Sequence, residues 1–501
     1  MSNTIDIGNG KQLFLDDRWF ADQRGMTLSV NPPIKDQIVL APGKKWDELA
    51  VYAYGTVLEH DGKFKMWYDG VSRLDNELPQ YRNICYAESD DGIHWERPNV
   101  GRYEWEGIRL NNIVLPGCNG GIMVDPNGPD EHRFKGLILV KENSVWPGSK
   151  GAICGLHGGR WRLELYLCTS PDGYNWTRHP TPVSDYFHDT QNQLFYDTRL
   201  GKYAAYFRTH SRGRTVGRLE VDDPMDLPWI PLDGEDPEAV FPTGKKHLFQ
   251  LALTADESDP ADADLYTACV HQYPWADDAY FSFTTPYRHY PVGDTSDTTL
   301  TGKDPRGRHN NDGPVDIQLA VSRDGIAWTR PDRRPYVGLG LAGEYDGGQS
   351  YMGLGMIRMG NEVWMYDSPT KRTHGVPPGQ PEAGLRLLRQ RLDGFISADA
   401  AYEGAEFTTP MLTFSGSELQ LNVDCSALGQ VWVEIRNEDN HVIDGYSLDE
   451  SIDIDRNHIA APVRWHEKDD VGELIGRPVR LHFKLRACKL YAFQFVDGEE
   501  G

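Results

Sequence analysis

The chain has 501 residues, and 51 lysines and arginines stand against 75 aspartates and glutamates, which gives a formal net charge of -24. This excess of negative charge argues against a polyanionic partner, so we expect neither nucleic acid nor a membrane surface as a ligand. The alternative is that the acidic residues only keep a large protein soluble. The length suggests two or three domains, or fewer if one is a large all-β unit.

The N-terminal segment MSNTIDIGNGKQLFLDD has neither a basic stretch nor an apolar core, and no run of about 18 apolar residues occurs in the chain. We therefore expect a soluble, cytoplasmic protein. Seven cysteines without a C-x-x-C pair indicate reduced thiols rather than a disulfide framework.

Short strands dominate the expected secondary structure, because 51 glycines and 32 prolines interrupt the chain too often for long helices. Five apolar segments each follow a turn and are typical of the second strand of a hairpin. They are residues 62–70, 132–140, 201–209, 278–287 and 361–369.

A seven-residue pattern, Ser-x-Asp-Gly-x-x-Trp, occurs three times, as SDDGIHW (89–95), SPDGYNW (170–176) and SRDGIAW (322–328). It predicts a turn in which Asp caps the local backbone, Gly accepts a positive φ and Trp packs after the reversal. The second interval is about twice the first, so one unit between them, at 189–230, lacks the turn. A last unit ends near residue 398, which makes five.

Four-stranded units repeated radially form a β-propeller, which buries each sheet between its neighbours. We therefore predict an all-β fold with a five-bladed β-propeller over residues 1–403. Beyond residue 404, apolar and polar residues alternate with frequent turn breaks, which predicts a β-sandwich domain over 404–501. Residues 479–495 are expected to form its closing hairpin.

The segments YGTVLEHDGKFKMWYDG, CYAESDDGIHWERP, HDTQNQLFYDTRLGKYAAYFR, QLAVSRDGIAWTRP and YMGLGMIRMGNEVWMYD resemble the furanosidase-type glycoside hydrolases, the group of arabinanases, β-xylosidases, invertases and levansucrases. The resemblance covers nearly the whole chain. It implies three carboxylates around the central funnel: a nucleophile or base, a general acid, and a third that orients the substrate. Cleavage of an acetal also requires one protonated and one ionised carboxyl group.

In such propellers the innermost strand opens each blade, so an acid just before that strand is expected to face the funnel. Asp47 is our candidate nucleophile or base, and Glu48 its replacement; the alternative is a loop acid or a cap. Asp189 stands in the polar cluster HDTQN, which predicts a catalytic or orienting role assisted by His188 and Gln191. The alternative for Asp189 is a structural hydrogen-bond network.

The general acid is expected to be Glu344 or Asp346, which precede a glycine-rich strand; the alternative is a turn residue. A mixed lining of aromatic and polar groups would suit a sugar. The expected substrate-binding residues are Glu48, His188, Gln191, Arg208, Asp264, Trp275, Asp277, Arg288 and His289. Blade packing is the alternative for the aromatic residues, and pairing with an acid for Arg208.

Two other strings carry less weight. VDPNG (124–128) is similar to the nucleophile string of invertases, but Val replaces its Asn, and a hairpin turn is expected at Asp125. GLGLAG (338–343) lacks the strand-to-helix context of a nucleotide site. No metal-ligand motif occurs, so no cofactor is expected, although structural Ca²⁺ in the oxygen-rich loops stays open.

The sequence thus predicts an exo-acting glycoside hydrolase for a furanosidic or related terminal sugar of a short oligosaccharide or small glycoside. A glycoside phosphorylase or transferase is the second hypothesis, and it should gather several basic residues near one acid. A non-catalytic carbohydrate-binding propeller is the third. The sandwich is expected to pack on the propeller, and a homo-oligomer stays open.

Overall fold

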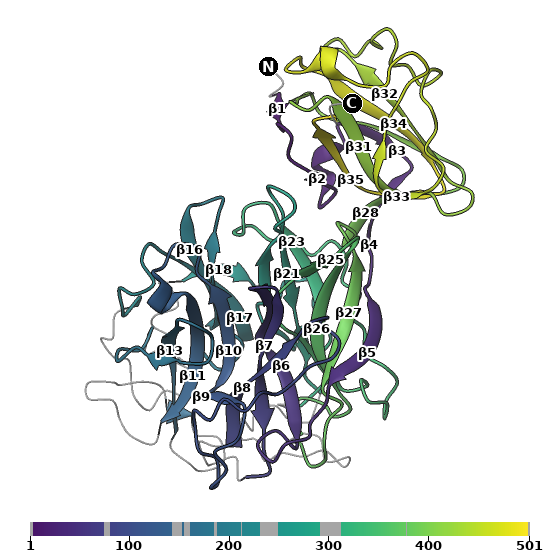
Figure 1. The fold of residues 1–501 in the computed structure, drawn as a ribbon. Coiled ribbons are helices and arrows are strands. Elements are labelled where there is room, and N and C mark those ends of the chain that lie inside the picture. The colour runs from purple at the N-terminus through teal and green to yellow at the C-terminus, as the bar shows by residue number, and fades with distance from the viewer. Residues whose placement is uncertain are drawn as a thin grey trace.

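The computed structural model describes residues 4–74, 81–142, 153–154, 161–184, 188–211, 213–230, 249–290, 312–376 and 378–498. Within these ranges the fold is all-β, as predicted, and its 3₁₀ helices include η1 (Asp17–Trp19), η3 (Asp130–His132) and η6 (Gly472–Leu474). The strands form a large propeller and a smaller body above it (Figure 1).

Five sheets form the blades of the propeller. Blade I contains β6 (Ala50–His60), β7 (Lys63–Val71), β8 (Arg82–Ser89) and β9 (Ile113–Pro116). Blade II contains β10 (Cys118–Val124), β11 (Phe134–Glu142), β13 (Trp161–Ser170), β14 (Thr177–Arg178) and β12 (Ile153–Cys154). Blade III contains β15 (Gln193–Asp197), β16 (Lys202–Ser211), β17 (Gly213–Val221) and β18 (Gln250–Leu253).

Blade IV contains β20 (Val270–Gln272), β21 (Tyr280–Thr284) and β23 (Gln318–Ser322), and the pair β19 (Ala263–Leu265) and β22 (Pro286–Arg288) lies at its end. Blade V contains β24 (Gln349–Met352), β26 (Glu362–Thr370), β27 (Leu385–Arg391), β5 (Ile34–Leu40) and β25 (Ile357–Met359). The predicted second strands correspond to β7, β11, β16, β21 with β22, and β26.

The ring is closed by a strand from the beginning of the chain. β5 pairs antiparallel with β27, with Leu40 opposite Leu385 and Ile34 opposite Arg389, and so becomes the outer strand of blade V (Figure 1). The first and last blades also meet at the axis, where Thr56 on β6 bridges Leu354. Strand β5 covers the edge that blade V would otherwise expose.

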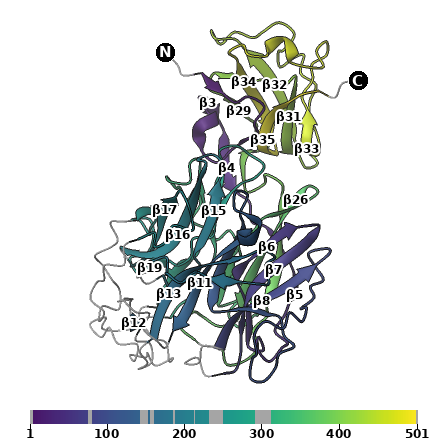
Figure 2. The ribbon, with the colours of Figure 1, turned by 60° about the vertical axis from the view of Figure 1, so that its left-hand side comes forward.

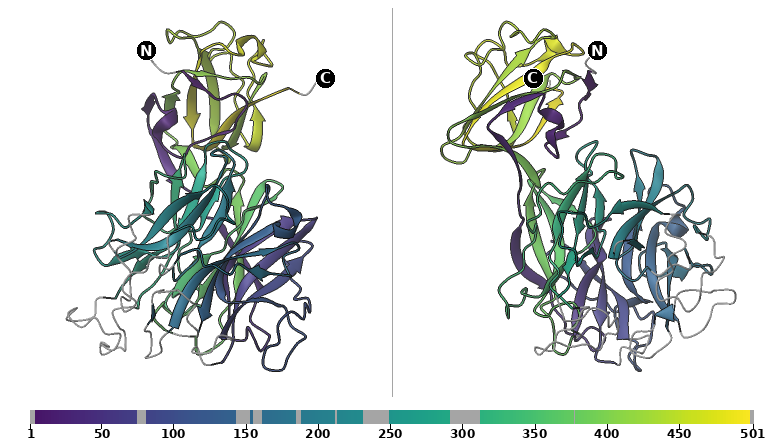
Figure 3. Two further views of the ribbon diagram at one scale, coloured as in Figure 1. Left: turned by 90° about the vertical axis from the view of Figure 1, so that its left-hand side faces the viewer. Right: turned by 180° about the vertical axis from the view of Figure 1, so that it is seen from behind.

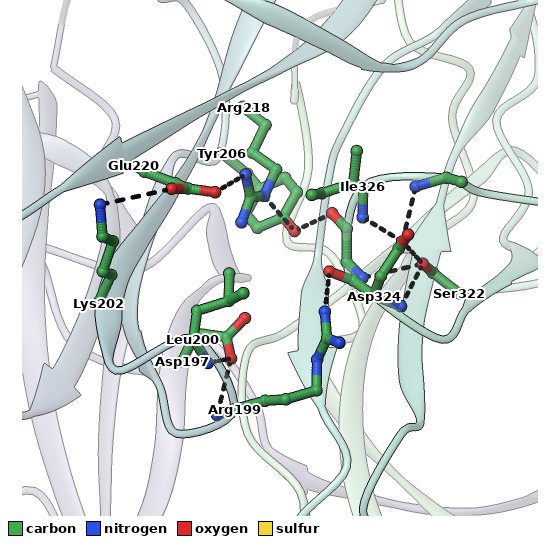
Figure 4. Close-up of polar contacts among 12 residues, drawn as sticks. Asp197, Arg199, Leu200, Lys202, Tyr206, Arg218, Glu220, Ser322, Asp324 and Ile326 are labelled. Atoms are coloured by element: carbon green, nitrogen blue, oxygen red, sulfur yellow. Dashed lines mark hydrogen bonds and ion pairs between the residues drawn. The ribbon is translucent and has the colours of Figure 1, made fainter. Parts of the chain in front are cut away.

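The Ser-x-Asp-Gly-x-x-Trp turns join neighbouring blades. In the turn of blade IV, the carboxylate of Asp324 accepts a hydrogen bond from the backbone N–H of Ile326 (Figure 4). Gly325 has a φ of +71°, and its carbonyl accepts from two donors, the indole of Trp328 at 3.2 Å and the hydroxyl of Tyr206 on blade III at 2.6 Å. The turn therefore fastens blade IV to blade III.

The other two copies make the same contacts. The carbonyl of Gly92 in blade I accepts from Tyr366 of blade V, and that of Gly173 in blade II accepts from Trp67 of blade I. Each copy of the pattern thus attaches its blade to the preceding one, which explains the repetition. Blade III lacks the turn, and an apolar cluster that includes Leu139, Leu167 and Phe207 packs it against blade II.

The upper body consists of two sheets with one core between them. The first contains β33 (Asn457–Pro462), β31 (Glu418–Asp424), β35 (Cys488–Val496), β28 (Ile396–Ala400), β4 (Met26–Val30) and β2 (Gln12–Leu13). The second contains β3 (Asp22–Arg24), β29 (Ala405–Thr408), β34 (Arg480–Arg486) and β32 (Gln430–Arg436), and β1 (Ile5–Asp6) pairs with β30 (Leu412–Thr413). Phe407 and Phe483 of one sheet and Leu421 and Phe493 of the other share the core. This is the arrangement of a β-sandwich.

The sandwich differs from the prediction in two respects. Strands β1 to β4 and β28 pair with its strands, so residues 5–30 and 396–400 lie in this body although residues 1–403 were predicted as propeller (Figures 2 and 3). The N-terminal strands supply edges that residues 404–501 lack. Strands β34 and β35 also do not form a hairpin, because the chain crosses between the sheets at Ala487, where φ is +47°.

Candidate active site

Four tyrosines form a row at the end of the propeller axis where the inner strands begin. The ring centroids of Tyr52 and Tyr54 on β6 are 6.3 Å apart, and Tyr54 lies 4.9 Å from Tyr351 on β24. Tyr351 in turn lies 5.8 Å from Tyr266, which follows β19. We call this row, with the charged residues and the histidine that contact it, the axial mouth. All four tyrosine side chains are buried.

Among the four predicted catalytic acids, Asp189 is the one that the structure brings to this mouth. Its side chain is half-buried, and it has no hydrogen-bond or ion-pair partner among the described residues. Burial, together with the negative charge of Asp189, raises the pKa of Tyr266. Asp189 therefore lies beside the last ring of the row with both carboxylate oxygens available to a ligand.

Arg208 lies on the other side of the same tyrosine. Its guanidinium is 4.3 Å from the ring centroid of Tyr266, and Nη2 donates a hydrogen bond to the carbonyl of that residue at 2.8 Å. The residue is 2% exposed, its Nε has no acceptor, and no described carboxylate forms an ion pair with it. A buried cation without a counter-ion is suited to a ligand that brings negative charge or several oxygens.

Asp264 and His289, two of the expected substrate-binding residues, also lie at the mouth. Asp264 binds Arg214 at 2.6 Å and His289 at 2.9 Å, and Arg214 lies 5.6 Å from the ring of Tyr266. Burial opposes ionisation of Asp264, but the hydrogen bond from His289 and the charge of Arg214 lower its pKa to about 2. Asp264 is thus an ionised acid with two partners.

Two further acid–arginine pairs lie at the other end of the tyrosine row. Arg82 binds Asp69 and stacks on Tyr52 and Tyr54. Arg372 binds Glu382 at 2.7 Å and donates a hydrogen bond to the hydroxyl of Tyr52. Burial raises the pKa of Asp69 and of Glu382 in spite of these arginines. Asp189 and Arg208 are therefore the charged residues of the described mouth that lack a partner of opposite charge.

His374 completes the wall beside the tyrosines. Its ring lies 4.6 Å from that of Tyr266, and its Nδ1 shares a hydrogen bond of 2.7 Å with the hydroxyl of Tyr351. Burial and the charge of Arg214 hold its pKa well below the usual range. The imidazole is therefore neutral and able to exchange hydrogen bonds with sugar hydroxyls.

Asp47 was predicted as a catalytic residue, but the structure places it in a structural role. It is fully buried and accepts hydrogen bonds from the backbone N–H groups of Gly43 and Lys44 and from the hydroxyl of Tyr68. Arg97 lies 3.1 Å from its Oδ2. The capping alternative fits this environment. Glu48, its replacement, points to Arg73 at 3.3 Å.

The predicted general acids, Glu344 and Asp346, are not in the mouth either. Glu344 is exposed and accepts a hydrogen bond from the backbone N–H of Leu341, as a turn residue does. Asp346 binds Lys35 on β5 at 3.0 Å and Arg386 on β27 at 2.9 Å. Because β5 and β27 are the outer strands of blade V, Asp346 faces away from the axis.

The remaining expected substrate-binding residues lie outside the mouth or support it from behind. His188 is buried and binds Ser184 and the carbonyl of Arg208, and burial lowers its pKa to about 4. Gln191 donates a hydrogen bond to the carbonyl of Met352. Both residues position the segment that carries Asp189. Arg288 binds Asp316 at 2.6 Å.

Trp275 and Asp277 line a different cavity, of about 930 Å³, at the opposite ends of the inner strands. Its walls come from the later part of β6, from β15 and β20, and from the segment around β25. The predicted set is therefore divided between the two ends of the axis. The turn expected at Asp125 is present, and Asp125 there binds Lys135 and Tyr203.

The tyrosine row, Arg82, His374 and Glu382 were missed from the sequence. A signal for the tyrosines was available, since VYAYG, DLYTA and QSYMG each place tyrosine at the beginning of a blade. Arg82 and His374 follow segments without a recognisable pattern. Glu382 lies in the loop between β26 and β27, where the sequence gives no sign of proximity to the axis.

Across the described ranges, no three His, Cys, Asp or Glu side chains are grouped so that they could hold a metal ion. Likewise, the described part of the chain contains no helix that is long and apolar enough to cross a membrane.

Comparisons with known proteins place the chain only loosely. No family profile matches it. Two proteins of Mycobacterium tuberculosis, the uncharacterized proteins MT1551 and Rv1502, are each 25% identical to it over 174 residues. These matches cover 30% of this chain and 48% of each relative, so the chain spans about half the length of the curated relatives it matches.

Several solved structures are similar in their strand arrangement. An exo-inulinase from Aspergillus awamori is 11% identical with a TM-score of 0.42, over 94% of this chain and 99% of that one. A Bombyx mori GH32 β-fructofuranosidase is 10% identical with a TM-score of 0.41, over 93% and 95% of the two chains. A GH130 structure, from work on mannoside phosphorylases and glycoside hydrolases, is 14% identical with a TM-score of 0.41, over 72% and 94%.

Proposed function

We propose that the axial mouth cleaves the glycosidic bond of a short oligosaccharide and that Asp189 is the ionised carboxylate of this reaction. The observation that carries the proposal is the isolation of Asp189 beside Tyr266, while Asp69, Asp264 and Glu382 each bind an arginine. Carboxylates entering a core are normally paired or hydrogen-bonded. A free one in an aromatic-lined mouth is a candidate for chemistry.

Glu382 is the proposed general acid. Burial raises its pKa, and it reaches Tyr52 through Arg372, whereas Asp189 lies beside Tyr266 at the other end of the row. Glycoside hydrolysis needs one carboxyl group that keeps its proton and another that stays ionised. The raised pKa of Glu382 is the property that supports its assignment as the group that keeps its proton.

A terminal furanosidic or related sugar is the proposed substrate. Tyrosine faces pack against the apolar faces of sugar rings, while Arg208 and His374 offer hydrogen bonds to hydroxyl groups. The row consists of four rings and is buried, which suits one end of a short chain better than the middle of a polymer.

The test is Asp189→Asn, assayed on a panel of furanosidic and pyranosidic disaccharides with detection of new reducing ends. We expect kcat to fall by at least about 10³-fold, because a carboxylate acting directly on the reacting bond is lost. Calorimetry should show that the saccharide still binds. Asp277→Asn, an exposed acid at the opposite end of the axis, is the matched control and should keep full turnover. Full turnover in Asp189→Asn would remove this residue from the mechanism.

A glycoside phosphorylase is the second candidate, and Arg208 is the observation that favours it. A phosphate group would supply the negative charge that this buried guanidinium lacks among the described residues. The same panel should then release a sugar phosphate only when inorganic phosphate is present. Arg208→Gln should abolish that phosphate dependence, whereas a rate that is independent of phosphate would favour the hydrolase.

A further inference from the structure

Two cysteines of the sandwich face each other across neighbouring strands. Asp424, the last residue of β31, pairs with Lys489 on β35, so Cys425 lies opposite Cys488. Both side chains belong to the sandwich core, where the thiol of Cys425 donates a hydrogen bond to the carbonyl of Ile454 at 3.3 Å and the thiol of Cys488 lies 4.0 Å from the carbonyl of Gln430. This contact lies in the upper body, away from the axial mouth.

The geometry is close to that of a disulfide. Directly opposed residues of an antiparallel pair have Cβ atoms about 4.5–5.5 Å apart, and a disulfide requires about 3.5–4.5 Å. A movement of about 1 Å therefore brings the sulfurs within bonding distance. The pair lies where both strands end, next to Ser426 at φ +49° and Ala487 at φ +47°. Turns on both sides make such a movement easier than it would be in the middle of the sheet.

The two thiols also differ in reactivity. The neighbouring thiol of Cys488 lowers the pKa of Cys425, whereas the neighbouring Cys425 and burial raise the pKa of Cys488. Both thiols are buried, and the chain that follows Cys425 reaches the surface at Ser426 and Leu428, which are exposed. Cys168 and Cys269 are buried in propeller blades, and burial raises their pKa values. Of the pair, Cys425 therefore has the greater thiolate character and is the attacking sulfur.

We propose that Cys425 and Cys488 are a reversible oxidation site that forms a disulfide on reaction with a peroxide. The Cys425 thiolate attacks one peroxide oxygen, the O–O bond breaks, and Cys425 becomes a sulfenic acid as one water leaves. The Cys488 sulfur then attacks the sulfenic sulfur, the S–O bond breaks and a second water leaves. In sum, two thiols and one hydrogen peroxide give one disulfide and two waters, and the sulfurs lose two electrons to the peroxide. A dithiol reductant reverses the reaction by exchange.

The test treats the folded full-length chain with hydrogen peroxide, then unfolds it without reductant and counts its thiols. Of seven cysteines, two should be lost, and dithiothreitol should restore them. Peptide mapping by mass spectrometry of the oxidised wild-type protein should find one cross-linked pair that contains Cys425 and Cys488. A count that stays at seven would overturn the proposal. So would oxidation of Cys425 to a sulfinic acid without a linked peptide.

Matched variants separate this pair from the other cysteines. Cys425→Ser and Cys488→Ser should each abolish the dithiothreitol-reversible loss of two thiols. Cys168→Ala, in blade II, should still lose two. If Cys425→Ser kept a reversible loss of two thiols, another pair would be responsible and the assignment would be wrong. The mapping of the wild-type protein decides the matter even if a serine variant folds poorly.

Discussion

Asp47 and Asp189 occupy equivalent places in their blades, since each stands shortly before an inner strand, β6 in blade I and β15 in blade III. Their surroundings are opposite. Asp47 is fully buried and saturated by two backbone N–H groups, a tyrosine and an arginine, whereas Asp189 is half-buried and without a partner among the described residues. The place of an acid before an inner strand therefore does not define its role. The role depends on whether neighbouring groups already form hydrogen bonds or ion pairs with its carboxylate oxygens.

The largest effect on stability should come from Asp47→Ala. This change leaves the guanidinium of Arg97, which is 15% exposed, without its carboxylate, and loss of one member of a buried ion pair costs about 3–5 kcal/mol. We expect the free energy of unfolding, measured from the first transition in urea, to fall by that amount. Turnover per folded molecule should stay unchanged. The adjacent Glu48→Gln, which affects only a half-exposed pair with Arg73, should cost less than about 1 kcal/mol. Loss of turnover in a folded Asp47→Ala protein would contradict the structural role of Asp47 and its difference from Asp189.

An intermediate effect is expected from Asp264, whose environment lies between the two extremes. Its pKa is about 2 in the folded protein against a usual value of 3.8, so the unfolded chain binds the proton more readily. This stabilisation is present above about pH 4, is lost as the pH falls through 2, and amounts to about 2 kcal/mol. Unfolding measured between pH 5 and pH 2 should show it. In Asp264→Asn the free energy of unfolding should fall by about 2 kcal/mol less between pH 5 and pH 2 than in the wild-type protein. An equal fall in both proteins would contradict the lowered pKa of Asp264.

The smallest effect should come from Glu344→Gln. The side chain is exposed and contributes one hydrogen bond within its own turn, which the amide oxygen can also accept. Stability should change by less than about 0.5 kcal/mol and turnover should stay the same. A large fall in turnover would return this residue to the general-acid role for which Glu382 is now proposed.

Much of the fold followed from local patterns. Strands β7, β11, β16 and β26 are apolar runs after turns, and the repeated Asp-Gly turns marked three blades. Strand β5 was missed because its sequence, IKDQIVL, contains nothing that points to β27. Residues 5–30 were missed for the same reason, since long-range pairing leaves no local signal. Among site residues, Asp189 was found from the density of polar groups around it. The prediction for Glu344 and Asp346 was wrong because the spacing of residues does not reveal their contacts. Glu344 accepts a hydrogen bond from Leu341, and Asp346 binds Lys35.

The pairing of early strands with late ones has a consequence for synthesis. Leu40 meets Leu385, and Leu13 on β2 meets Ala492 on β35, so segments that leave the ribosome early wait for partners that are made near the end. Contacts so distant along the chain are slow to form and leave unpaired edges exposed meanwhile. The propeller cannot close before β27 (Leu385–Arg391) has been made, and the sandwich cannot be completed before β35 (Cys488–Val496), so both bodies are completed only late in synthesis.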